Sequence, residues 1–551
     1  MKKVKLLAIA LLTCSTVIAE THARSGDGRV ALMDGLGELH HPVTTDRSRA
    51  QLFFDQGLKL IYGFNHDEAE RSFRRAAELD PNMAMAYWGI ALAMGPNYNL
   101  PVDAEREKIA FENIQKAKAL ASKASANERG YVEALAKRYT DAPNPDYQQL
   151  AAAYKDAMRE FSRKFPDDPD AATLYAESIM NLRPWALWER DGAPAEGTEE
   201  IVSVLESVLR RYPVHIGAMH FYIHAVEASP HPEHALSVAN KLASLAPAAG
   251  HLVHIPSHIY MRTGFYNAAM RANVTAAMAD EEYIEFTGAT GVYPMMYYSH
   301  NLHFVAVSAG MEGQYARAKM AADALVEHVS PHLKEMPMLE SFMVVPLTVD
   351  LRFERWNEIL KRPQPNPNLK IAIPAMWHYA RGVALAATGK TQQAEAERQI
   401  FEDFAAGTPE DAIWAPPFNN KTKNILKIAA NVLQARIAVA NRDYPNAIRL
   451  YQDAVGLQDG LNYGEPPDWY FPVREALGGA LLESGDFVAA EKVFRADLEC
   501  NPRNGRSLFG LARSLAGQGR NYDADLVRQQ FEVAWKNADS PLEVEQVASG
   551  R

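Results

Sequence analysis

The sequence contains very few cysteines. Its 551 residues include two, Cys14 and Cys500. We expect Cys14 to be removed with the N-terminal segment, which leaves Cys500 without a partner in the same chain. An intramolecular disulfide is therefore excluded as a source of stability, and helix packing must provide it.

Long apolar runs are also scarce. The clearest run, Leu6 to Ala19, is shorter than the about 20 residues that cross a bilayer. Lysines precede the run, and small residues near Ala23 could end a cleavage site. We expect residues 1–23 to be a signal peptide, the mature protein to be secreted or periplasmic, and no transmembrane segment to follow. Cys14 only loosely fits a lipoprotein cleavage box, so lipidation is set aside.

Excess positive charge and familiar catalytic motifs are missing as well. The net charge of −11 repels phosphate backbones, so nucleic acid is not an expected partner. The sequence has no Gly-rich phosphate loop, no G-x-S-x-G elbow and no HEXXH helix. These absences exclude the enzyme classes that those motifs define.

The sequence does contain an internal repeat. In the segment from Phe53 to Pro81, Gly57, Ala69 and Phe73 have the spacing of a helix–turn–helix unit of roughly 34 residues. Small residues let the two helices approach each other, and the phenylalanine fills the seam to the next unit. Similar units begin at Tyr87, Ala235, Gly264, Gly313, Ala380, Ala447 and Arg474.

These units resemble tetratricopeptide repeats. The chain after the N-terminal segment also resembles exported bacterial repeat proteins that begin with HHPVTT, here residues 40–45, and carry a central HIPSHIYMRTG segment, here residues 254–264. The resemblance implies an all-α solenoid, a right-handed superhelix of helical hairpins in the cell envelope, and no particular activity. We expect an extended segment over residues 24–50, repeats with a histidine-rich concave groove over 51–340, and further repeats over 341–551.

Histidines are concentrated in the middle of the chain and recur at matched repeat positions. Ten of the 17 histidines lie between His215 and His303. The matched sets are His220, His254 and His303; His224 and His258 one turn later; and His251 and His300 one turn earlier. Residues three, four and seven apart share one helix face, so each unit carries a histidine stripe, which the resemblance places in the concave groove.

Imidazole pairs with a carboxylate nearby are the ligands that zinc, copper, iron or nickel prefers. The seven matched histidines are therefore candidate metal ligands. Glu177, Glu227 and Tyr260 are candidate acid–base groups. Pro256 interrupts the central segment, so a helix is expected to begin there.

Neighbouring residues suggest a ligand beside the metal. Arg262, Asn301 and Tyr297 could bind an anionic or aromatic substrate. The alternative is that tyrosines and histidines hydrogen-bond one another in a polar groove without metal. His40 and His41 have no repeat-matched partner and are expected to form a loop or capping segment.

Three functions remain open from the sequence. The first is a scaffold whose groove binds a peptide, a small molecule or a protein partner. The second is a metal-dependent enzyme, a hydrolase or an oxidoreductase, which needs an open coordination position. The third is metal storage or delivery.

Overall fold

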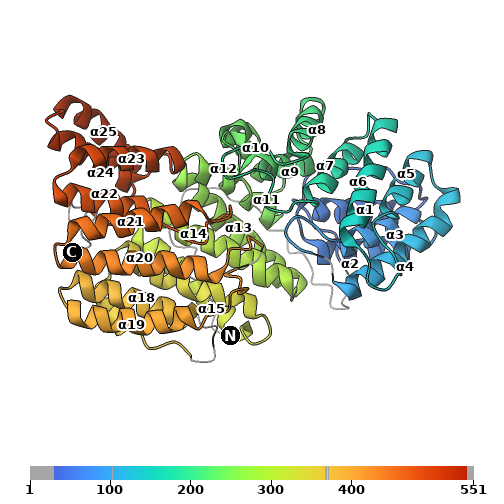
Figure 1. The fold of residues 1–551 in the computed structure, drawn as a ribbon. Coiled ribbons are helices and arrows are strands. Elements are labelled where there is room, and N and C mark those ends of the chain that lie inside the picture. Colours follow the sequence, from blue (N-terminus) through green and yellow to red (C-terminus); the bar gives the residue numbers. More distant parts are fainter. Residues whose placement is uncertain (1–29, 102, 367–368, 370–371, 416, 543–551) are drawn as a thin grey trace. The chain divides into compact units, whose positions relative to one another are not determined.

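The chain folds into α-helices. The computed structural model describes residues 30–101, 103–366, 369, 372–415 and 417–542 (Figure 1). Within these ranges no β-strand forms, and three isolated bridges, Asn97 to Leu100, Trp188 to Pro194 and Ile413 to Lys421, are the β-type pairings. Successive helices pack as antiparallel hairpins, which confirms the predicted all-α, tetratricopeptide-type fold class.

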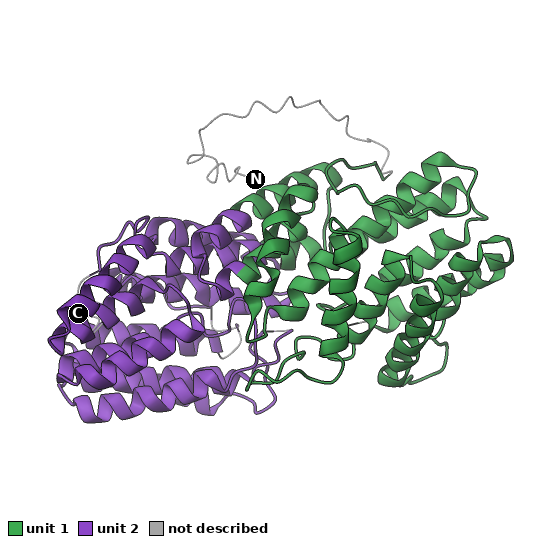
Figure 2. Ribbon diagram, turned by 90° about the horizontal axis from the view of Figure 1, so that it is seen from above, with its two compact units in different colours: residues 1–259, 274–298 green, residues 260–273, 299–551 purple. Residues whose placement is uncertain are grey.

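The helices group into two compact units, coloured separately in Figure 2. Unit 1 comprises residues up to 259 together with 274–298. Its helices are α1 Ser48–Tyr62, α2 His66–Leu79, α3 Ala84–Met94, α4 Ala104–Leu120, α5 Ala126–Leu135, α6 Tyr147–Lys164, α7 Pro169–Met180, α8 Thr198–Arg211, α9 Ile216–Val226, α10 Leu236–Leu245 and α11 Gly250–His254, with short 3-10 turns at Ala121–Lys123 and Pro232–Ala235 and a π-helical stretch at Tyr293–Tyr298.

Unit 2 comprises residues 260–273 and 299 onward. Helices α12 Pro256–Arg262 and α13 Tyr266–Thr287 have residues in both units. The other helices of unit 2 are α14 Ser299–Met311, α15 Tyr315–Val329, α16 Val345–Arg352, α17 Trp356–Lys361, α18 Ala372–Ala387, α19 Thr391–Ala406, α20 Thr422–Ala440, α21 Tyr444–Asp459, α22 Val473–Ser484, α23 Phe487–Cys500, α24 Gly505–Gly517 and α25 Asn521–Ala534, with 3-10 turns at Ser330–His332 and Pro337–Val344.

The glycine and phenylalanine positions of the repeat pack as predicted. The buried Phe73 ring of α2 lies against Gly57 of α1 and Gly89 of α3, and a Cβ atom on either glycine would overlap the ring. Phe494 of α23 lies in the same way between Gly478 and Gly510. The absence of a side chain at these glycines therefore sets how closely three successive helices approach.

Polar caps fix the start of several helices. Asn65 accepts the backbone N–H of Glu68 at the start of α2, and Ser125 and Glu128 form a capping box at the start of α5. Caps of this kind satisfy backbone donors that the first helical turn leaves unpaired.

Residues 30–47, the described part of the chain before α1, are not helical and pack on the helices of unit 1. The Ala248 N–H donates to the Gly35 carbonyl oxygen, and the Thr44 N–H donates to a carboxylate oxygen of Glu128. The division of the chain at residues 50 and 340 stays a prediction.

Other predictions concern the two ends of the chain. The proposed signal peptide at residues 1–23 lies outside the described residues. Among the helices of the described part, none is long and apolar enough to cross a membrane. Cys500, at the end of α23, is exposed and forms no disulfide with the described part of the chain.

Candidate metal centre

Three short helices, α9, α11 and the first turn of α12, position the central histidines in unit 1. His220 and His224 lie one turn apart on α9, and Glu227 caps the C-terminal end of that helix. His251 and His254 lie on α11, which ends where Pro256 begins α12, so His258 lies on the next helix. The break occurs at the proline because its ring cannot continue the preceding helix.

Five imidazoles form a closed ring, called here the histidine ring. Each imidazole contacts at least two others within unit 1. The distances between ring centroids are 4.9 Å for His220 to His251, 4.9 Å for His220 to His224, 5.6 Å for His224 to His258, 4.9 Å for His258 to His254, and 5.5 Å for His254 to His251.

Hydrogen bonds to the outside of the histidine ring fix three of the tautomers. The Nδ1 atom of His220 lies 2.7 Å from the Tyr62 carbonyl oxygen, which can only accept, so Nδ1 carries the proton. His224 and His258 use Nδ1 in the same way toward the two oxygens of Glu227. The Nε2 atom of each of these three imidazoles is therefore left with a lone pair.

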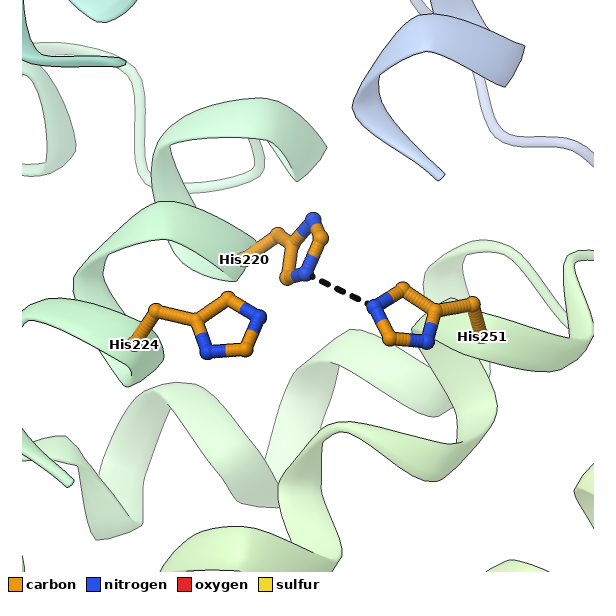
Figure 3. Close-up of side chains that lie close together, drawn as sticks. All are labelled: His220, His224 and His251. Carbon is orange, nitrogen blue, oxygen red and sulfur yellow. Dashed lines mark hydrogen bonds between the residues drawn. The ribbon is translucent and has the colours of Figure 1, made fainter. Parts of the chain in front are cut away.

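The Nε2 atoms turn toward one another. The Nε2 atoms of His220 and His251 are 3.1 Å apart, and a dashed line marks this hydrogen bond in Figure 3. The Nε2 atoms of His254 and His258 are 2.9 Å apart. One proton satisfies each of these two contacts. The Nε2 atom of His224 is buried and has no hydrogen-bond partner among the described residues. One atom from each of His220, His224 and His251 lies within 4.8 Å of the others.

The five imidazoles are buried, and burial disfavours the charged form of His220, His224 and His251. All five are at most 3 % exposed. Burial, and then the neighbouring His224, hold the pKa of His220 well below 6.5, and burial does the same for His251 together with His220. Burial would raise the pKa of Glu227, but His258 and His224 outweigh it and lower that pKa to about 2. Glu227 is thus an ionised group that contacts the histidine ring through His224 and His258.

An aromatic collar of Phe64, Tyr98, Trp185 and Tyr297 surrounds the histidine ring. Phe64 stacks on His251 with centroids 5.3 Å apart, and Tyr98 and Trp185 contact His224 at 5.0 and 5.7 Å. Phe64 and Trp185 have φ of 54° and 60°, which non-glycine residues rarely adopt. The sequence analysis did not name Phe64, Tyr98 or Trp185, because these residues lie in loops without helical periodicity.

Two other residues named from the sequence lie in unit 1. Tyr297 contacts the edge of His251 at 4.9 Å and accepts a weak hydrogen bond from Asn99, and burial raises its pKa to about 12. Glu177, on α7, accepts a hydrogen bond from Asn181 and interacts with the buried Arg138. No ligand group detected among the described residues includes Glu177.

The remaining candidates belong to unit 2. They are Tyr260, Arg262, His300, Asn301 and His303. His303 packs edge-on against Phe342 and Tyr470, and burial lowers its pKa to about 3. The Arg262 guanidinium lies 5.7 Å from the Tyr463 ring centroid.

Two further clusters of side chains in unit 1 contain residues that can bind a metal. The residues of the first cluster already bond other groups, and those of the second are exposed to solvent. His41 bonds Asp170 at 2.7 Å, while the oxygens of Asp168 accept from the start of α7 and from Asn127 and Tyr131. The other group comprises His231, Glu233 and His234, and all three are exposed. The histidine ring is therefore the stronger candidate.

Comparison with known proteins gives little beyond the fold. No protein-family model matches the chain, and no curated protein does. Solved structures that resemble it include human IFIT1 with m7Gppp-AAAA (13% identity, TM-score 0.34, covering 90% of this chain and 92% of that one) and yeast Tom70 (13%, 0.28, 91% and 94%). The tetratricopeptide domain of P58(IPK) is another (11%, 0.23, 86% and 98%). These scores are too low to support an argument about function.

Proposed function

We propose that this chain is an envelope repeat protein that holds one transition-metal ion in the histidine ring of unit 1. The observation that carries the proposal is the orientation of His224. Its Nδ1 atom donates to Glu227, and its buried Nε2 atom has no hydrogen-bond partner among the described residues. A buried lone pair without a partner is costly unless a proton or a metal ion occupies the space it faces.

The donor set matches borderline divalent metals. Imidazole nitrogens suit zinc, copper, iron and nickel, with zinc–nitrogen bonds of about 2.0–2.1 Å. Donor atoms on one ion are then roughly 3–4 Å apart. The separation of 3.1 Å between His220 and His251 fits that requirement without a change in the backbone.

Glu227 would orient the ligands and would not itself be one. Both of its oxygens accept Nδ1 protons, from His224 and from His258. A carboxylate that bonds the outer nitrogen of a metal-binding histidine fixes the tautomer and makes the imidazole more basic. Glu227 also supplies a negative charge that partly offsets the charge of a divalent ion.

The enclosure of the histidine ring favours metal holding over catalysis. A catalytic ion keeps a coordination position open to substrate or water. Here every imidazole is buried, and the aromatic collar packs around the ring. Storage, delivery or structural use of the ion is therefore the function that the geometry supports best.

A metal titration of the tag-free full chain tests the proposal. Wild-type protein is expected to bind one Zn²⁺ per chain by calorimetry. The double variant His224→Ala/His258→Ala should lose the bound metal while its helical circular dichroism is unchanged. Glu227→Gln should weaken binding about 10–100-fold, because its amide would face one of the two Nδ1–H donors.

His234→Ala is the matched control, because this histidine is exposed and belongs to a different group. It should bind zinc like the wild type. Equal zinc binding by the double variant, or none by the wild type, would reject the metal site.

The alternative is a scaffold without metal. Stacked helical hairpins are a scaffold that fits a protein-binding role, since such repeats present extended surfaces to a partner. In that case two contacts are simply hydrogen bonds of a polar core, namely His220 with His251 and His254 with His258. The protein would then fold equally well with a chelator present.

We also propose export to a bacterial envelope. The support is the lysine-then-apolar N-terminal segment. Cell fractionation with N-terminal sequencing of the mature chain tests it, and an intact Met1 on cytoplasmic protein would contradict it.

A further inference from the structure

Unit 2 contains a cavity that the proposed metal site does not use. Its volume is about 120 Å³, and it is lined from α16, α18, α20, α22, α24 and the loop that precedes α22. An apolar cavity of about 150 Å³ is large enough to take benzene. The space in unit 2 is of the same order, so it suits a small molecule with one aromatic ring.

Besides aliphatic residues, two kinds of side chain line the wall of this cavity. One part is aromatic, with Tyr379 and Trp414 and the consecutive Trp469, Tyr470 and Phe471. The other part is cationic, with Arg352, Arg436 and Arg506. Three guanidiniums in one small cavity are expensive unless anions neutralise them.

Glu475 neutralises part of this charge. It forms an ion pair with Arg352, whose guanidinium also lies 4.5 Å from the Phe471 ring centroid. The same carboxylate oxygen is 3.8 Å from Arg506. Burial, and then repulsion by Arg352, lower the pKa of Arg506 to about 10, so Arg506 remains charged at neutral pH.

The carboxylates that interact electrostatically with Arg436 are those of Glu354 and Glu483. The Nη1 atom of Arg436 is buried and has no hydrogen-bond partner among the described residues. Burial raises the pKa of the nearby Glu354 to about 7, although Arg506 and Arg436 act in the opposite direction. Burial also raises the pKa of Asp468, another lining residue, to about 7. Burial thus disfavours the charged form of both carboxyls, which weakens their neutralisation of the nearby guanidiniums.

We propose that this cavity binds a small carboxylate with a planar aromatic body, of about the size of benzoate. The carboxylate would pair with Arg436 and Arg506, because a guanidinium matches the two oxygens of a carboxylate geometrically. The aromatic body would pack against the tryptophan and tyrosine rings of the wall.

Calorimetry of the full chain with sodium benzoate tests this site. The wild type is expected to bind benzoate, and benzamide, the neutral molecule of the same shape, to bind at least tenfold more weakly. Arg436→Gln should also weaken benzoate binding at least tenfold. Arg449→Gln on α21 is the control, because that side chain is 61% exposed, and it should bind like the wild type.

The melting temperature separates a binding role from a structural one. Without ligand, Arg436→Gln should melt at or above the wild-type temperature, because it removes a buried charge without a hydrogen-bond partner at Nη1. If Arg436→Gln fails to fold, Arg506→Lys provides the second test and should weaken benzoate binding while it keeps the charge. The proposal would be overturned if the wild type does not bind benzoate or binds benzamide equally well. It would also be overturned if the variants bind benzoate as tightly as the wild type, or if inorganic phosphate binds more tightly than benzoate.

Discussion

Asp170 shows how one buried carboxylate organises several side chains of unit 1. Its oxygens accept from His41 at 2.7 Å, from Tyr62 at 2.6 Å and from His215 at 3.1 Å. The sequence predicted only that His41 belongs to a loop or cap, because Asp170, which its imidazole bonds, lies 129 positions away in the chain. Burial disfavours the charged forms of both His41 and Asp170. Even so, hydrogen bonding to Asp170 raises the pKa of His41, and His215 and His41 lower the pKa of Asp170 far below 3.8.

The stability of the protein should therefore have a pH optimum that depends on Asp170. His41 has a raised pKa, so its contribution is complete below pH 6.5 and is lost as the pH rises through the folded-state pKa. Asp170 has a lowered pKa, so its contribution is complete above the unfolded value of 3.8 and is lost as the pH falls. Asp170→Asn should flatten this profile and cost about 3–5 kcal/mol of unfolding free energy, because it breaks a buried pair.

Denaturant unfolding between pH 3 and pH 9 measures that profile. Asp167→Asn is the control, because this carboxylate is 92% exposed and pairs with Arg211 at the surface. Its expected cost is about 0–1 kcal/mol. An Asp170→Asn variant with an unchanged pH profile would show that the pair contributes nothing.

Helix packing is the level at which the sequence was most informative. The spacing of Gly57 and Phe73 predicted a helical hairpin, and the structure has the phenylalanine ring between two glycines. Histidine spacing placed His220 and His224 on one helix face, as found. The same spacing could not reveal that Glu227 bonds two imidazoles, or that Phe64 and Trp185 surround them. Loop residues with positive φ depend on distant contacts, which a local pattern does not contain.

Two glycines of unit 2 should respond in opposite directions to the same change. Gly510→Ala on α24 would place a Cβ against the Phe494 ring, and it should lower the unfolding free energy by about 1–3 kcal/mol. Gly456→Ala on α21 meets nothing within 4 Å, so it should raise that free energy by about 0.5–1 kcal/mol through helix propensity. Thermal melts of both variants measure the difference, and destabilisation by both would contradict this account of the repeat.

At the scale of the whole molecule, the sequence predicted a repeat protein and a region of interest, but no certain chemistry. Repeats are readable because each unit needs the same sizes at the same positions. A metal site depends on which nitrogen of each imidazole carries a proton. Residues outside the helix determine the position of that proton, and for His220 the determining group is the Tyr62 carbonyl oxygen. His303 has the repeat position of His220, yet its neighbours in unit 2 are Phe342 and Tyr470.

The central claim is that the histidine ring holds a metal ion in the native protein. Elemental analysis of untagged protein, purified from its native compartment without chelators, tests it most directly. The account predicts close to one zinc, copper, iron or nickel ion per chain, and none in the His224→Ala/His258→Ala variant purified in parallel. The account would be contradicted if fully folded native protein contains no transition metal, or if the variant contains as much metal as the wild type. The metal-free scaffold would then be the remaining function.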